Sequence, residues 1–178
     1  MGKQALCTLA LLLLPGLASA ASFTPLGFLN GGTGSQASGV SADGSVVVGF
    51  SAGEAFRWTG GVMTGLGVLS DYTASEAFGV SADGAVVVGD SFTSIDGDKY
   101  EEAFRWTAGV MTGLGVAVPP DYIASEANGV SADGSVVVGE SYGEAFRLTG
   151  GVMTRLGSLS GGTSSDAFGV SADGSVVV

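Results

Sequence analysis

The chain repeats one segment of sequence four times, and this repetition restricts its possible folds more than any other feature. The string Gly-Val-Ser-Ala-Asp-Gly recurs at spacings of 40, 50 and 40 residues, each time followed by a small residue and three valines. The four copies begin at Gly39, Gly79, Gly129 and Gly169. Two other strings, Glu-Ala-Phe-Arg and Gly-Val-Met-Thr, recur between these copies in a fixed order. The chain is therefore an array of one supersecondary unit of about 40 residues.

Each unit carries the signals of short strands joined by tight turns. In the second unit Asp83-Gly84 lies between two apolar segments, and Asp-Gly is a strong signal for a two-residue hairpin loop. Such a loop favours a positive φ at both of its residues. This hairpin would place Val80 opposite Val87.

A second turn signal, Gly60-Gly61, predicts another hairpin in which Trp58 opposes Met63. Each unit then contains four short antiparallel strands. Three consecutive valines put apolar side chains on both faces of one strand, so that strand has to be covered on both sides. Stacked copies can provide this cover, whereas one isolated sheet cannot.

Four strands in every 40 or so residues predict an all-β repeat protein with the four-stranded antiparallel units of a β-propeller. The alternative is a β-solenoid, which would use parallel strands without hairpin turns. Residues 22–27 align with residues 62–67, and the Ala-Phe-Arg-Trp strand that precedes such a segment elsewhere is absent ahead of them. The sequence ends at Val178, within the valine strand of the fourth unit. This phasing predicts an incomplete ring that belongs to a longer chain.

Residues 1–20 have a different composition from the repeats. Lys3 precedes an apolar run, and Pro15-Gly16 breaks that run ahead of Ala18-Ser19-Ala20, so the segment is predicted to be a secretory signal peptide. Residues 21–178 then form the repeat domain. The apolar run is too short to cross a bilayer of about 30 Å. We expect a mature chain without a membrane span that is secreted, extracellular or at the cell surface, with the periplasm as a further possibility.

The composition of the repeat domain excludes several classes of function. Beyond Ala20 there are five basic residues and 17 acidic residues, a net charge of −12. The sequence has no histidine, and its one cysteine, Cys7, lies in the predicted signal peptide. Zinc sites of His or Cys, thiol catalysis and a histidine base are therefore excluded. A nucleic-acid partner is not expected either, because a strongly acidic surface repels phosphate.

The repeats resemble those of the HAF family of extracellular repeat proteins, which is named after a His-Ala-Phe tripeptide. The segments that carry the resemblance are each followed by Gly-Val-Met-Thr, and they are 55–58, 103–106 and 145–147. In this chain the family's histidine is replaced by Glu54, Glu102 and Glu144, and the third copy has Leu148 in place of tryptophan. The resemblance implies bacterial export and a β-rich repeat fold, and it implies no particular activity.

One insertion, residues 90–102, distinguishes the second unit and adds about eight residues to it. Four oxygen ligands lie within seven residues of this predicted loop, namely Asp96, Asp98, Glu101 and Glu102. Hard oxygen donors at this density suit calcium, which makes these four residues a candidate calcium site. The alternative is a solvated acidic loop. No other cofactor is expected.

Other recurring residues favour structural roles. Asp43, Asp83, Asp133 and Asp173 could form a ring of metal ligands, but each precedes glycine in a predicted turn, where aspartate is favoured for backbone reasons. Arg57, Arg105 and Arg147 could line an anion channel, but we expect each of them to pair with an acid such as the nearby glutamate.

Residues 49–53 and 139–143 match the Gly-x-Ser-x-Gly pattern of hydrolase nucleophiles. They occupy equivalent positions in two repeats and have neither a following helix nor a histidine base, so we interpret both as connections between strands.

The sequence predicts a secreted, non-enzymatic scaffold for binding or surface display, with an extracellular ligand or surface component as its partner. One alternative is an exported enzyme that processes glycans with paired carboxylates, since only Asp and Glu are available as acid and base. Another is the passenger domain of an autotransporter or of a sorted surface protein.

Overall fold

The computed structural model describes residues 23–115 and 124–178, and they form strands and turns without a helix. Accordingly, this part of the chain contains no helix long and apolar enough to cross a membrane. The predicted signal peptide, residues 1–20, lies outside the described residues.

Three sheets, each of four antiparallel strands in chain order, make up the fold. The first sheet contains β1 (Ser35–Val40), β2 (Val46–Ser51), β3 (Glu54–Thr59) and β4 (Val62–Gly65). The second contains β5 (Ala74–Val80), β6 (Val86–Ile95), β7 (Asp98–Thr107) and β8 (Val110–Gly113). The third contains β9 (Ser125–Val130), β10 (Val136–Ser141), β11 (Glu144–Thr149) and β12 (Val152–Arg155). The fourth repeat contributes an isolated antiparallel bridge between Val170 and Val177.

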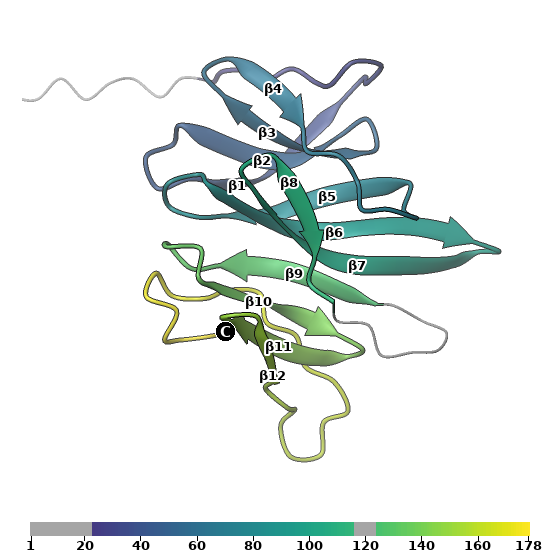
Figure 1. The fold of residues 1–178 in the computed structure, drawn as a ribbon, viewed down its shortest axis with the longest axis vertical. Coiled ribbons are helices and arrows are strands. Elements are labelled where there is room, and N and C mark those ends of the chain that lie inside the picture. The colour runs from purple at the N-terminus through teal and green to yellow at the C-terminus, as the bar shows by residue number, and fades with distance from the viewer. Residues whose placement is uncertain (1–22, 116–123) are drawn as a thin grey trace, which may run out of the picture.

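The sheets stack face to face, one repeat upon the next (Figure 1). Strand β5 contacts both β1 and β9, so the first strands of successive repeats lie side by side. This is the arrangement of blades in a β-propeller, and it confirms the predicted all-β, propeller-like fold. The alternative of a β-solenoid is wrong, because every pair of neighbouring strands within a sheet is antiparallel.

In the second and third repeats the three valines bury side chains on both faces of their strand, as predicted, whereas Val176 and Val178 of the fourth repeat are exposed. Val87 packs with Phe104 in the core between the first and second sheets. Val86 and Val88 belong to the core between the second and third sheets, and all three valines are buried. Burial of each such side chain is worth about 1.5–3 kcal/mol, and here nearly all of it depends on the neighbouring repeat.

The Asp-Gly turns have the predicted register but not the predicted conformation. Val80 pairs with Val87, as expected. Gly84 has a φ of 71°, whereas Asp83 does not adopt a positive φ. Its carboxylate instead accepts hydrogen bonds from the Ser81 hydroxyl, at 2.6 Å, and from the main-chain N–H two residues later, at 3.0 Å. The aspartate therefore stabilises the turn through its side chain, in the manner of an Asx turn.

The Gly60-Gly61 hairpin matches the prediction in full. Both glycines have a positive φ, 59° and 89°, as the tight turn requires. Trp58 lies opposite Met63.

Two sets of hydrogen bonds join one repeat to the next. The Asp-Gly turns form a ladder in which the N–H of Ala82 donates to the carbonyl of Ala132 at 3.0 Å. Elsewhere the buried Ser75 hydroxyl accepts the N–H of Ala55 from the previous sheet at 2.9 Å and donates to the carbonyl of Gly67 at 2.6 Å. The contacts between sheets are thus polar at defined points as well as apolar.

The recurring arginines also connect repeats, and the prediction that each pairs with an acid is wrong. Arg57 donates to the carbonyl of Gly84 in the next repeat at 3.1 Å, and Arg147 donates to that of Gly174 at 3.1 Å. Residues three apart on a strand point to opposite faces of the sheet. The side chains of Glu54 and Arg57 therefore cannot form an ion pair with each other. Glu54 instead accepts the N–H of Gly67 at 2.6 Å.

Replacing Arg105 with methionine should lower the free energy of unfolding by about 1.5–3 kcal/mol, because Arg105 donates to the carbonyl of Gly134 in the third repeat. Urea unfolding at low and at high NaCl measures the effect. Since the acceptor is a neutral carbonyl, the loss should be similar in both buffers. A loss that disappears at high salt would show that an ion pair carries the interaction.

Candidate functional site

The acidic insertion of the second repeat is a β-hairpin rather than a loop. It lengthens β6 and β7, which pair continuously as far as Ile95 and Asp98. Asp96 and Gly97 form the tip, with φ values of 54° and 94°. The hairpin extends well beyond the neighbouring strands (Figure 1). The chain thus departs from its repeat symmetry at this hairpin.

The four residues of the candidate calcium site do not converge. Asp96 and Asp98 are exposed at the tip of the hairpin. Glu101 and Glu102 lie further down β7, and as neighbours on a strand they point to opposite faces of the sheet. The hairpin therefore presents its acids at three separate places.

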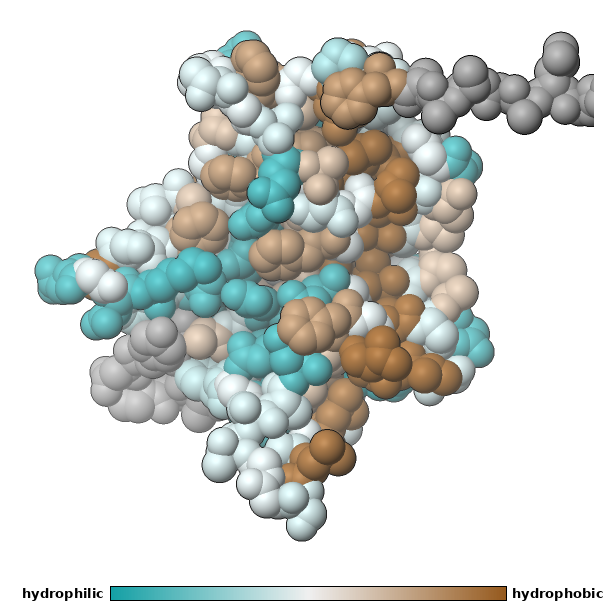
Figure 2. Space-filling model, turned by 180° about the vertical axis from the view of Figure 1, so that it is seen from behind, coloured by the Kyte–Doolittle hydropathy of each residue, from teal (hydrophilic) through white to brown (hydrophobic). Residues whose placement is uncertain are grey.

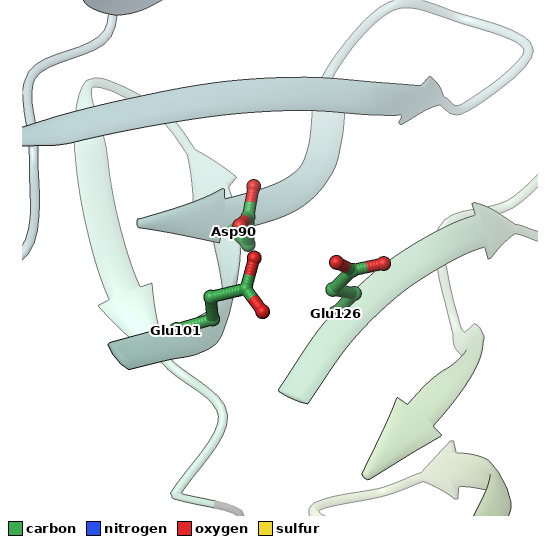
Figure 3. Close-up of side chains that lie close together, drawn as sticks. All are labelled: Asp90, Glu101 and Glu126. Carbon is green, nitrogen blue, oxygen red and sulfur yellow. The ribbon is translucent and has the colours of Figure 1, made fainter. Parts of the chain in front are cut away.

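Glu101 belongs instead to a cluster of carboxylates between the second and third sheets. Asp90 on β6, Glu101 on β7 and Glu126 on β9 each place an oxygen within 4.8 Å of the others. The three side chains point toward one another (Figure 3). An isolated parallel bridge between Glu101 and Ala124 holds the two sheets together at this point. We call Asp90, Glu101 and Glu126 the carboxylate cluster.

Little positive charge balances the carboxylate cluster. Asp90 is 1% exposed, and its Oδ1 has no hydrogen-bond partner among the described residues. Lys99 forms an ion pair with Glu101, and its Nζ also lies 4.7 Å from the centre of the Phe92 ring. One ammonium group thus faces three carboxylates. Such a set of oxygens can hold a proton or a cation.

The electrostatics of Asp90 reflect this shortage of positive charge. Burial raises the pKa of Asp90 from 3.8 to about 7; Lys99 opposes the shift, and the negative charges of Glu126 and Glu76 add to it. Glu76 pairs with Asp90 across the strands, and burial raises its pKa as well. The two sheets therefore enclose acids that retain protons more readily than usual.

Folding stability in the presence of a chelator should fall as the pH rises from about 4 to about 7. In this window folded Asp90 keeps a proton that the unfolded chain has lost, so the free energy of unfolding decreases with pH. Replacing Asp90 with asparagine should flatten this decline. Urea midpoints measured at half-unit steps of pH test the assignment, and parallel slopes for both proteins would contradict it.

The turn aspartates change folding stability with pH in the opposite direction, and they do so at lower pH. Hydrogen bonds from neighbouring hydroxyls and N–H groups lower to about 2 the pKa values of Asp43, Asp133 and Asp173. Their contribution is present above pH 3.8 and is lost as the pH falls toward 2. Stability should therefore be greatest between these two declines.

The other face of the hairpin borders a second feature, a hollow of about 260 Å³. Its lining residues are Ser70, Asp71, Tyr72, Thr93, Ile95, Tyr100 and Glu102. We call it the hairpin groove. Burial and the adjacent Glu102 raise the pKa of Tyr72 to about 12. Two aromatic rings and two carboxylates thus line the same small hollow.

Seen from behind, the protruding hairpin carries predominantly hydrophilic side chains (Figure 2). A larger hollow of about 550 Å³ lies over Val47 on the first sheet, but no charged side chain is among its described lining residues. Of these two hollows, the hairpin groove is the one that combines aromatic rings with charge, as ligand sites commonly do.

Sequence reasoning missed two of the three residues of the carboxylate cluster. Asp90 was visible only as the first residue of the insertion, and Glu126 as part of a recurring Ser-Glu-Ala string. The pairing of Val80 with Val87, continued without a break, would have placed Asp90 opposite Ala77. The bulge between Ala77 and Gly79 shifts the register by one residue and brings Glu76 opposite Asp90 instead. Glu126 comes from the next sheet, and no pairing within one repeat indicates it.

The two Gly-x-Ser-x-Gly segments are not nucleophile elbows. Each forms the tight turn between the second and third strands of its sheet, where Ala52 and Tyr142 have φ values of 55° and 54°. No helix follows within the described residues. The interpretation as connections between strands is confirmed.

The fold and its symmetry-breaking hairpin define an all-β repeat protein of the β-propeller type. Solved structures of TolB β-propeller proteins share this fold. A protein assigned as TolB from Agrobacterium tumefaciens matches with a TM-score of 0.55 and 18% identity, over 80% of this chain and 52% of that one. TolB from Acinetobacter baumannii matches with a TM-score of 0.51 and 16% identity, over 79% of this chain and 36% of that one.

The aligned region thus spans about half or less of each TolB chain. At this level of identity the likeness establishes the fold alone. No family model matches the sequence, and no curated protein does.

Proposed function

We propose that this chain is a secreted, non-enzymatic scaffold that binds an extracellular ligand or surface component through the hairpin groove. The observation that carries the proposal is the break in symmetry: among the three central hairpins that the structure describes, the one in the second repeat is extended, and the extension forms one wall of the hollow. Binding residues are commonly found on variable segments held by a rigid scaffold.

Export is supported by the composition of residues 1–20 and by the resemblance of the repeats to HAF extracellular proteins. The propeller-like fold supports the role of a scaffold, because the repeats bury one another's faces and leave their edges free to vary. Neither the sequence nor the described residues offer a histidine or cysteine for catalysis beyond the first 20 residues.

The chemistry of the groove favours a ligand with a positively charged group. Asp71 and Glu102 supply negative charge, and Tyr72 and Tyr100 supply aromatic rings on which an ammonium or guanidinium group can rest. The overall net charge of −11 attracts such ligands from solution as well. A peptide segment with lysine or arginine fits these requirements.

The test is an array of peptides that contain single lysine or arginine residues, probed with the wild-type protein and with a trimmed variant. In the variant, Ala-Gly replaces residues 92–101, which reproduces the turn that Ala52-Gly53 makes in the first repeat. Because that turn already occurs in this fold, the variant should fold. We expect peptides that bind the wild type with micromolar affinity to lose at least ~10-fold in affinity for the trimmed variant and for Tyr100→Ala.

Phe168→Ala, which removes an exposed aromatic ring from the fourth repeat, is the control and should leave binding unchanged. If no peptide distinguishes the trimmed variant from the wild type, the groove is not the binding surface.

A second candidate function is the processing of glycans by paired carboxylates. In its favour, Asp90 has a raised pKa and lies within 4.8 Å of ionisable partners, as an acid and a base would. Against it, Asp90 is almost fully buried, and a catalytic acid must touch its substrate. Release of nitrophenol from a panel of nitrophenyl glycosides by the wild type, and not by Asp90→Asn, would establish this activity.

A further inference from the structure

We propose that the carboxylate cluster binds one calcium ion, which joins the second and third sheets at the base of the protruding hairpin. Asp90, Glu101 and Glu126 are the protein ligands, and they come from strands β6, β7 and β9. The proposal does not depend on what the hairpin groove binds.

The spacing of the oxygens fits calcium. Ca–O bonds of 2.3–2.6 Å separate two ligands on opposite sides of the ion by roughly 4.6–5.2 Å. The ligand atoms of the three carboxylates all lie within 4.8 Å of one another. Magnesium demands near-ideal octahedral geometry and usually keeps several waters, so calcium is the better match to three carboxylates from three strands. The absence of histidine from the sequence, together with the oxygen-only donors, disfavours transition metals.

Burial gives an independent reason to expect an ion. The Asp90 side chain is turned into the cluster and is 1% exposed, yet its Oδ1 has no hydrogen-bond partner among the described residues. A buried carboxylate oxygen without a donor is costly and is normally satisfied by a donor or a cation. Figure 3 shows that the carboxylates of Glu101 and Glu126 face this oxygen-rich space.

The charge balance points the same way. When all three carboxylates are ionised they carry three negative charges, and Lys99, which pairs with Glu101, contributes a single positive charge. A divalent cation would neutralise the remaining two. Waters and the neighbouring Glu76, which pairs with Asp90 across the strands, could complete the six to eight oxygens that calcium takes.

Binding of calcium would stabilise the fold by linkage, because the unfolded chain does not hold the three strands together. The test is thermal unfolding of the purified protein at pH 7.5 with 2 mM CaCl₂ and with EDTA, combined with calorimetric titration of calcium. We expect calcium to raise the Tm by about 5 °C or more. Asp90→Asn and Glu126→Gln should each weaken binding at least ~10-fold and abolish most of the shift in Tm.

The matched controls are Asp96→Asn and Asp98→Asn, which remove the same charge at the exposed tip of the hairpin and should leave calcium binding unchanged. If Asp90→Asn failed to fold, Glu126→Gln would still decide the question, because Glu126 is only partly buried. Identical melting curves with calcium and with EDTA, or binding that depends on Asp96 and Asp98 rather than on Asp90 and Glu126, would overturn the proposal.

Discussion

Replacing Gly89 with alanine should lower the free energy of unfolding by about 3 kcal/mol or more, although the change adds a single methyl group. Gly89 lies on β6 opposite a bulge in β5, where the register shifts between Ala77 and Gly79. A Cβ at Gly89 would collide with the carbonyl oxygen of Glu76. The obstacle is backbone rather than a flexible side chain, so the bulge itself would have to move.

A Cβ at Gly49 or at Gly139 would likewise collide with a backbone carbonyl oxygen of the neighbouring strand. This explains why every complete repeat has glycine after its valines. Urea unfolding followed by circular dichroism measures the effect. Gly34→Ala is the matched control, because a Cβ there has no heavy atom within 4 Å and its φ is not positive. That variant should stay within about 0.5 kcal/mol of the wild type. Equal losses in the two variants would show that the close contact at Gly89 is not the cause.

The second large effect is expected for Phe104→Ala, which should cost about 3–5 kcal/mol. Phe104 is 0% exposed and belongs to the core that holds the first sheet against the second. Its removal leaves a cavity between two repeats. The cavity weakens the interface through which each repeat stabilises its neighbour. Trp106 packs against the same core, so its fluorescence should report the loosened contact during urea unfolding.

Phe168→Ala makes the same chemical change at a side chain that is 71% exposed, and it should alter the free energy of unfolding by less than about 0.5 kcal/mol. A cost below about 1 kcal/mol for Phe104→Ala would mean that the sheets do not depend on the core between them.

Much of the fold was predictable because its signals are local and repeated. The pairing of Val80 with Val87 and of Trp58 with Met63 follows from turn residues next to the strands that they join. Repetition strengthened these predictions, since one interpretation had to fit several copies of each string. The conformation at Asp83 was wrong because composition cannot distinguish a left-handed aspartate from one that accepts hydrogen bonds through its side chain.

The candidate site was less predictable. The four acids of the insertion are neighbours in sequence, but a continuous hairpin separates them along its length and across its two faces. Arg57 donates to a carbonyl of the next repeat rather than pairing with the glutamate three residues before it, because the two side chains lie on opposite faces of the strand. Closeness along an extended strand is a poor guide to contact, because successive side chains point in opposite directions.

The amino-acid sequence alone determined the repeat length, the four strands of each unit, the register next to the tight turns and the need for neighbouring copies to cover the valines, since all of these depend on residues a few positions apart. Only the tertiary structure decided that Asp90, Glu101 and Glu126 meet, and that a groove opens on the other face of the same hairpin. The physical reason is that both features lie between elements distant in the chain. Which side chains meet there depends on how the sheets stack, and that stacking is not encoded in any short stretch of residues.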